Sequence, residues 1–304
     1  MAPPLRPEPI SLREAARRLD VHYMTAYRYV RTGRLPARRD GQEWQVEVAD
    51  LELVHPTAPA GPAASGAAAG PGPRARRDRV PILQARMIAG DEAGAWRVVQ
   101  DALASGLEPA GVYLDLLVPV LCRVGESWAQ GTMTVAAEHR ASAVAQRIIG
   151  RLGPMFARRG RKRGTVIIGA PAGDQHSLPG AIVADLLRGQ GFEVIDLGPN
   201  TPAESFAETA QQAPRLVAVV IGVSAPGVDD AVRAAVAAVR DAGAAVPVLA
   251  GGSAVGGTEH AAGLGADAWT GPDGRSVLAA VDRVARRTRP AGKAPPAGKD
   301  QPRS

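Results

Sequence analysis

The sequence predicts a multidomain protein in which two helical units precede a doubly wound α/β domain. Its 304 residues exceed the length of one average domain. Residues 56–79 are rich in Pro, Ala and Gly and nearly lack large apolar side chains, which predicts a flexible linker. Residues 80–160 repeat apolar positions at helical spacing, whereas residues 163–288 alternate short β-branched runs with Ala-rich helical stretches. Residues 289–304 share the composition of the linker and are expected to form a disordered tail.

The first unit, residues 8–55, has the pattern of a winged helix-turn-helix. Ser11 precedes a short helix with one apolar face, and Glu14 follows at the spacing of a capping box. A tight turn leads to a second helix that Gly33 ends, and a hairpin wing that turns at Asp40-Gly41 follows. The unit resembles the excisionase and MerR type of winged helix-turn-helix, which implies that paired subunits bind double-stranded operator DNA. A solvated arginine-rich face is the alternative. The side chains expected at phosphates or base edges are Thr25, Tyr27, Arg28, Arg31, Arg38 and Arg39.

The second unit, residues 80–160, predicts a bundle of about four helices. The runs "VPILQARMI", "AWRVVQDAL" and "VYLDLLVPVL" place apolar residues at helical spacing, with few turn residues inside them. The stretch "WAQGTMTVAAEH" places Trp128 ahead of the adjacent Glu138 and His139. Taken alone, a tryptophan and an ionisable pair are ordinary core and rim residues of such a bundle.

The third unit predicts five parallel strands alternating with helices, because strands buried on both faces form continuous apolar runs. The expected strands are "TVIIGA", "FEVIDLG", "LVAVVIGVS", "VPVLAGG" and "ADAWTG". In a flavodoxin-like strand order, the loops after the first, third and fourth strands converge on one crevice at the carboxyl ends of the strands. These loops are "GDQHSLPG", "SAPG" and "GGS".

The loop after the first strand contains the strongest candidate metal ligand. Asp174 stands two residues before His176, so its carboxylate can hold one ring nitrogen while the other coordinates a metal. Gly180 lets the next helix begin close to a ligand, and Gly251 and Gly252 remove side chains where an elongated group could pass. A lone loop histidine is usually structural, but here the spacing of Asp174, His176 and Gly180 agrees with Ser224 and the glycine pair in the other two loops.

Together these loops resemble the cobalamin-binding domain of corrinoid proteins. The resemblance implies that His176 is the lower cobalt ligand and that Asp174 is its hydrogen-bond partner. It also implies that Ser224, Gly251 and Gly252 line the channel for the displaced nucleotide tail. The Ala-Pro pair after Ser224 departs from the larger apolar residue that many relatives carry two places on.

The order of the three units resembles the CarH/LitR type of cobalamin-dependent photoreceptor regulators. In that family the bundle covers the upper axial adenosyl group, which implies this role here for Trp128, Val135, Glu138 and His139. The family's best-known members carry a histidine directly after the tryptophan, and it binds cobalt after light breaks the cobalt–carbon bond. This sequence has Ala129 there, and a methyl group cannot coordinate cobalt. His139 is the other nearby histidine that could take its place.

The sequence as a whole is expected to encode a cytoplasmic DNA-binding regulator without catalytic activity. Cys122 is the only cysteine, which suits a reducing compartment, and the N-terminus lacks the apolar core of a signal peptide. The expected function is that of a repressor that forms a dimer or tetramer with adenosylcobalamin and responds to light. The alternatives are a light-insensitive cobalamin sensor, a corrinoid carrier subunit of a methyltransferase or mutase, and a regulator that has lost cobalamin.

Overall fold

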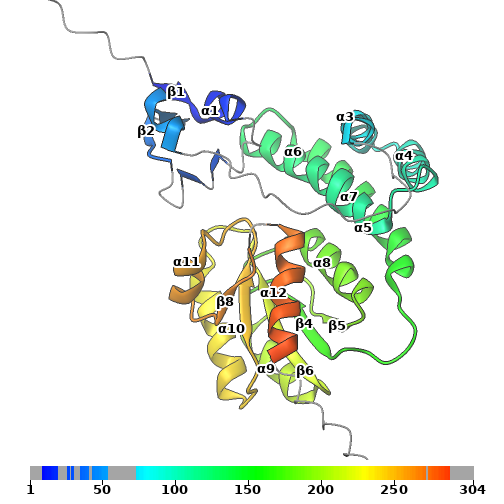
Figure 1. The fold of residues 1–304 in the computed structure, drawn as a ribbon, viewed down its shortest axis with the longest axis vertical. Coiled ribbons are helices and arrows are strands. Elements are labelled where there is room, and N and C mark those ends of the chain that lie inside the picture. Colours follow the sequence, from blue (N-terminus) through cyan, green and yellow to red (C-terminus); the bar gives the residue numbers. More distant parts are fainter. Residues whose placement is uncertain are drawn as a thin grey trace, which may run out of the picture. The chain divides into compact units, whose positions relative to one another are not determined.

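The computed structural model describes three parts of the chain, and Figure 1 labels their helices and strands where there is room. The described residues are 9–19, 26–27, 29–30, 35–40, 43–53, 73–271 and 273–287. The expected tail and the DNA-contact candidates Thr25, Arg28 and Arg31 lie outside them, and so does the side chain of Arg39. No helix in these ranges is long and apolar enough to cross a membrane.

The N-terminal unit combines a short helix with a small antiparallel sheet. Its elements are β1 (Ile10–Ser11), α1 (Leu12–Arg18), β2 (Arg38–Asp40), β3 (Glu43–Val46) and the 3-10 helix η1 (Val48–Leu53). The strand order is β1-β3-β2, and Asp40 pairs with Glu43, so the predicted hairpin is present. The Ser11 hydroxyl accepts the Glu14 amide N–H at 3.3 Å, which is half of the predicted capping box. The Glu14 carboxylate pairs instead with Arg17 and Arg18, because both guanidinium groups lie on the next helical turn.

The bundle contains four helical runs, as the apolar spacing predicted. They are α3 (Pro73–Ala89), α4 (Glu92–Ala104), the run α5–η2–α6 (Pro109–Gly111, Val112–Leu117, Val118–Ala129) and α7 (Val135–Leu152) with the 3-10 turn η3 (Gly153–Phe156). Helix α3 begins at Pro73, so the end of the segment predicted as linker is helical. The physical reason is that proline fits the first turn of a helix, and the arginines after it have high helix propensity.

The third run of the bundle is a continuous helix with a π-helical stretch, η2, in its middle. The Val118 amide N–H donates to the carbonyl of Tyr113, five residues earlier. Pro119 follows directly, and its ring would crowd the carbonyl four residues before it in a regular α-helix. The wider π turn relieves this crowding, and it buries Tyr113, Leu116 and Leu117 together in the core of the bundle.

The α/β domain has the predicted doubly wound architecture. Its parallel strands are β4 (Thr165–Gly169), β5 (Glu193–Asp196), β6 (Leu216–Gly222), β7 (Val248–Gly251) and β8 (Ala268–Trp269). The order β5-β4-β6-β7-β8 is the flavodoxin-like order, which confirms the prediction. Helices α8 (Leu178–Gly189) and α12 (Gly274–Arg287) pack on one face of the sheet. Helices α9 (Ala203–Gln212), α10 (Asp229–Asp241) and α11 (Thr258–Gly263) pack on the other (Figure 1).

A buried polar joint connects the bundle to the α/β domain. The Tyr113 hydroxyl, on η2, donates to Oδ2 of Asp185, on α8, at 2.7 Å. Oδ1 of Asp185 accepts the Arg188 guanidinium at 2.9 Å, so this 5% exposed carboxylate is satisfied on both sides. Burial and the bond to Asp185 raise the pKa of Tyr113. The Tyr113 ring also stacks on Phe156 with ring centroids 5.0 Å apart.

Candidate functional site

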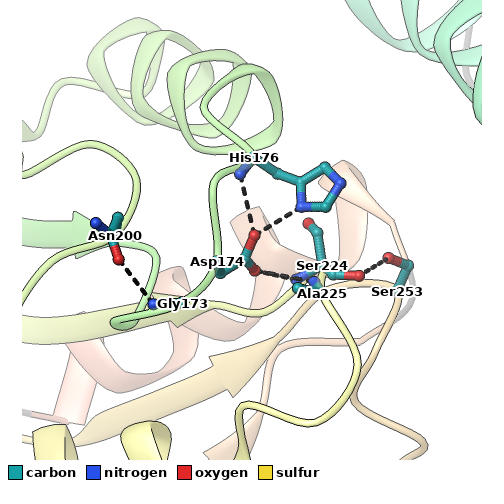
Figure 2. Close-up of polar contacts among 7 residues, drawn as sticks. All are labelled: Gly173, Asp174, His176, Asn200, Ser224, Ala225 and Ser253. Carbon is teal, nitrogen blue, oxygen red and sulfur yellow. Dashed lines mark hydrogen bonds and ion pairs between the residues drawn. The ribbon is translucent and has the colours of Figure 1, made fainter. Parts of the chain in front are cut away.

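The imidazole of His176 is held by one nitrogen and presents the other outward. Nδ1 of His176 lies 2.7 Å from Oδ1 of Asp174, and the same oxygen accepts the backbone N–H of His176 at 3.0 Å. The side chain of His176 is 57% exposed, whereas that of Asp174 is 0% exposed. Figure 2 shows the second ring nitrogen on the side of the ring away from Asp174. The predicted pairing of these two side chains is therefore present, and a basic nitrogen faces outward from the loop.

Asp174 also joins the loop after β4 to the loop after β6. Its second oxygen, Oδ2, accepts the backbone N–H groups of Ser224 at 2.6 Å and Ala225 at 3.0 Å (Figure 2). Burial raises the pKa of Asp174, but the bonds from His176, Ser224 and Ala225 outweigh it, and the pKa falls to about 2. The hydrogen bond between the His176 ring and Asp174 raises the pKa of His176. Burial lowers this pKa, and the negative charges of Asp174 and Glu138 raise it. The carboxylate thus fixes both the ring orientation and the approach of the two loops.

Asn200 supports this loop from the neighbouring strand connection, and sequence reasoning missed it. Its side-chain oxygen accepts the backbone N–H of Gly173 at 2.7 Å, and its backbone N–H donates to the Asp174 carbonyl at 2.7 Å. Asn200 has φ +52°, a left-handed conformation that asparagine adopts more readily than most residues. Its place in "LGPNT", directly after β5, was the available signal.

The three predicted glycines have different surroundings. A Cβ atom at Gly180, near the start of α8, would meet no atom within 4 Å. A Cβ at Gly251 would lie 1.6 Å from the hydroxyl oxygen of Thr270, and one at Gly252 would lie 2.3 Å from the carbonyl oxygen of Val223. Gly251 and Gly252 are therefore required by close packing within the domain, and Gly180 leaves open space beside the loop of His176. The Thr270 hydroxyl is buried and has no hydrogen-bond partner among the described residues.

The bundle residues singled out in the sequence lie where α6 ends and α7 begins. Trp128 is 54% exposed and Val135 is 56% exposed, both high values for large apolar side chains. Glu138 accepts the Ser142 hydroxyl, and its second oxygen lies 3.6 Å from Nε2 of His139. Glu138 also acts electrostatically on His176, which relates this end of the bundle to the loop after β4. Trp128, Val135 and His139 make no described contact with His176.

Two of the DNA-contact candidates can be placed within the N-terminal unit. Tyr27 packs edge-on against Trp44 of β3, with ring centroids 6.5 Å apart, so its ring is part of the small core. Arg38 is exposed on β2. The described residues contain no group of three or more His, Cys, Asp or Glu that could hold a metal ion, so a metal at His176 would need ligands from outside these side chains.

Three protein families match successive parts of the chain. The family described as a helix-turn-helix domain matches residues 10–53. Two families, each described as a B12 binding domain, match residues 83–152 and residues 164–282. These matches coincide with the N-terminal unit, the bundle and the α/β domain in turn.

Curated proteins of two kinds are similar to this chain. Trimethylamine corrinoid protein 1 of Methanosarcina acetivorans is 32% identical over 132 residues, which are 42% of this chain and 61% of that protein. The HTH-type transcriptional repressor CarH of Myxococcus xanthus is 36% identical over 110 residues, 36% of each chain. The chain thus spans less than two thirds of the length of the curated relatives that it matches.

A solved structure supports the fold. The monomethylamine corrinoid protein of Methanosarcina barkeri superimposes with a TM-score of 0.58 at 20% identity. The match covers 68% of this chain and 99% of that chain. The bundle followed by a parallel α/β domain is therefore an arrangement that this chain shares with that corrinoid protein.

Proposed function

We propose that the chain is a transcriptional regulator that binds adenosylcobalamin through His176 and loses affinity for DNA in light. Cobalamin binding is supported by two B12-binding family matches and by corrinoid relatives. The adenosyl form, the response to light, the repressor role and the cofactor-dependent dimer or tetramer are the parts that extend beyond these matches.

The observation that carries the proposal is the imidazole of His176, held at Nδ1 by a buried carboxylate with the other nitrogen outward. A corrin ring supplies four nitrogen ligands of its own, so cobalt in it would need only a single ligand from the protein. The absence of a three-ligand cluster among the described residues is compatible with such a cofactor. The residues present therefore fit cobalamin: His176 would hold the cobalt, and Asp174 would fix the ring nitrogen that does not bind it.

Two further features of the structure are compatible with bound adenosylcobalamin. Trp128 and Val135 leave apolar surface exposed at one end of the bundle, where an adenosyl group could be covered. The buried Thr270 hydroxyl beside Gly251 lacks a partner among the described residues and would supply one to a polar group of the nucleotide tail. When bound, adenosylcobalamin supplies a cobalt–carbon bond that light can break.

The regulatory part of the proposal rests on the helix-turn-helix match over residues 10–53 and on the similarity to CarH. A single unit of this size binds DNA weakly, so dark oligomers would hold several units on one operator, and their separation would lower the affinity. Ala129 stands where the CarH/LitR resemblance implies a histidine, so His139 would be the nearby imidazole left to bind cobalt after illumination. We further propose a cytoplasmic location and no catalytic activity of the chain itself.

Absorption spectra test the cofactor and its response to light. The purified chain is mixed with adenosylcobalamin, and spectra and gel-filtration volumes are recorded before and after green light. We expect a spectral change on mixing, its loss in His176→Ala, and a smaller particle after illumination. His260→Ala is the matched control, because the His260 ring accepts a local bond from the Gly256 N–H. Binding that is unchanged in His176→Ala would exclude this ligand, and an unchanged particle size would leave a light-insensitive sensor.

A corrinoid carrier that serves a methyltransferase is the second candidate, because several corrinoid proteins are among the curated relatives. This carrier function predicts a methyl group on the bound cofactor and no sequence-specific DNA binding. Selection of operator sequences from a random DNA pool distinguishes the two candidates. Enrichment of a repeated site supports the regulator, whereas no enrichment supports the carrier.

A further inference from the structure

The loop between the bundle and the α/β domain is strongly basic. Residues 158–163 read RRGRKR, five cations in six residues. The Arg163 N–H donates to the Gly191 carbonyl just before β5, at 2.9 Å. The side chain of Arg215, just before β6, donates to the Lys162 carbonyl at 3.1 Å. The loop therefore lies along the amino ends of the strands, at the edge of the sheet opposite His176.

The end of α12 adds further cations at the same edge. Arg163 pairs with Asp282 on α12, and Nε of Arg286 lies 2.7 Å from the other oxygen of Asp282. One carboxylate thus lies between two guanidinium groups, beside an open groove of about 500 Å³. Arg283 and Arg287 are exposed on the same helix end. We call residues 158–163, Arg215 and these α12 arginines the basic patch.

Most of this positive charge is not neutralised within the domain. In the part of the chain that the structure describes, the exposed Arg158, Arg159 and Arg161 make no ion pair, and neither do Arg283 and Arg287. Arginines in the last turn of a helix interact favourably with its dipole, which is a sufficient structural reason for the α12 cations. It does not account for the loop, which lies outside any helix. Like charges on neighbouring residues repel one another within the Debye length, about 8 Å at physiological salt, so a polyanion would relieve this repulsion.

We propose that the basic patch binds the phosphate backbone of double-stranded DNA without reading its sequence. The choice of DNA over another polyanion rests on the proposed regulatory function, since a DNA-binding unit on the same chain would hold the duplex at high local concentration. Guanidinium groups match phosphate geometry, and exposed cations that are not tied to carboxylates contact phosphates at little cost in broken pairs. The patch supplies affinity, and the N-terminal unit selects the site.

The salt dependence of DNA binding by the full chain tests this inference. Fluorescence anisotropy with a labelled random-sequence duplex and with a selected operator is measured from about 50 to about 200 mM salt. The test variant carries Arg158→Gln, Arg159→Gln and Arg161→Gln. Among the residues that the structure describes, the side chains of these three arginines make no hydrogen bond or ion pair. The control carries Arg97→Gln, Arg123→Gln and Arg147→Gln, three exposed arginines of the bundle, and loses the same charge. Of these three, Arg147 pairs with Glu92 at 2.8 Å, so thermal melting of the control also measures the loss of that pair.

Three phosphate contacts contribute about 2.7 to the slope of log K against log salt. Between about 50 and 200 mM salt, the unaltered chain should therefore lose about 40-fold more affinity than the test variant, on both duplexes. The control should follow the unaltered chain, and thermal melting should show that both variants fold. Equal slopes for the test variant and the unaltered chain would overturn the inference, as would equal losses in the test and control variants.

The remaining outcomes separate this inference from the proposed function. If the unaltered chain binds no DNA, both the proposed function and this inference are refuted. If the test variant binds the operator with an unchanged salt slope, only the role of the basic patch in DNA binding is refuted. A test variant that changes particle size, with an unchanged slope, would show that the patch contacts a second copy of the chain and would overturn the DNA assignment.

Discussion

Replacing Asp174 by asparagine tests whether this carboxylate organises the site. The side chain is fully buried and accepts N–H groups from His176, Ser224 and Ala225. The fall of its pKa from 3.8 to about 2 corresponds to about 2 kcal/mol of stability at neutral pH. An asparagine amide keeps one acceptor oxygen and turns an NH₂ group toward other donors, so a loss of this size or larger is expected.

The pH dependence of that loss has a defined sign. Because the pKa of Asp174 is lowered in the folded state, its contribution is complete above pH 3.8 and is lost as the pH falls through about 2. Urea unfolding of the cofactor-free chain should therefore show Asp174→Asn less stable by about 2 kcal/mol at pH 7, and by roughly half of that at pH 3. Asp196→Asn, which removes an exposed carboxylate with a single backbone bond, is the control. A change below about 0.5 kcal/mol at pH 7 would refute the stabilising role of Asp174.

Three further substitutions test neighbouring features. Gly252→Ala should destabilise the chain by more than about 2 kcal/mol in urea unfolding, because φ is +116° and its Cβ would lie 2.3 Å from the Val223 carbonyl oxygen; normal stability would contradict this packing. Tyr113→Phe should cost about 1–3 kcal/mol, since the buried Asp185 loses a donor, and an unchanged melting curve would mean that water replaces the hydroxyl. Because Trp128 is exposed, Trp128→Ala should change the stability of the cofactor-free chain by less than about 0.5 kcal/mol. It should weaken adenosylcobalamin binding about 10- to 100-fold in spectral titrations, whereas a large loss of stability would make Trp128 a core residue instead.

Much of the α/β fold was predictable because its physical signals are local and repetitive. Each strand buried on both faces is a short apolar run, and each helix between strands shows one apolar face, so the alternation itself predicted the parallel sheet. The start of α3 was misjudged because "GPRARRDR" continues the Pro- and Gly-rich composition before it. Charged residues that favour helices do not stand out when the composition of a long window is averaged.

The candidate site was only partly predictable. The contact between Asp174 and His176 followed from two residues close in sequence, whereas the second carboxylate oxygen is satisfied by backbone N–H groups fifty residues away. Every residue except proline carries such a donor, so no residue type marks it. The requirement for Gly252 likewise follows from a backbone approach by Val223, which only the packed sheet creates.

The polar joint at Tyr113 fixes the base of the helical run that carries Trp128. Helix α6 begins at Val118, five residues after Tyr113, and runs for 12 residues, about 18 Å, to Ala129, next to the exposed Trp128. A tilt of about 10° around the base would displace that tip by about 3 Å. A small angular change at the bond between Tyr113 and Asp185 would therefore become a displacement of atomic size at Trp128.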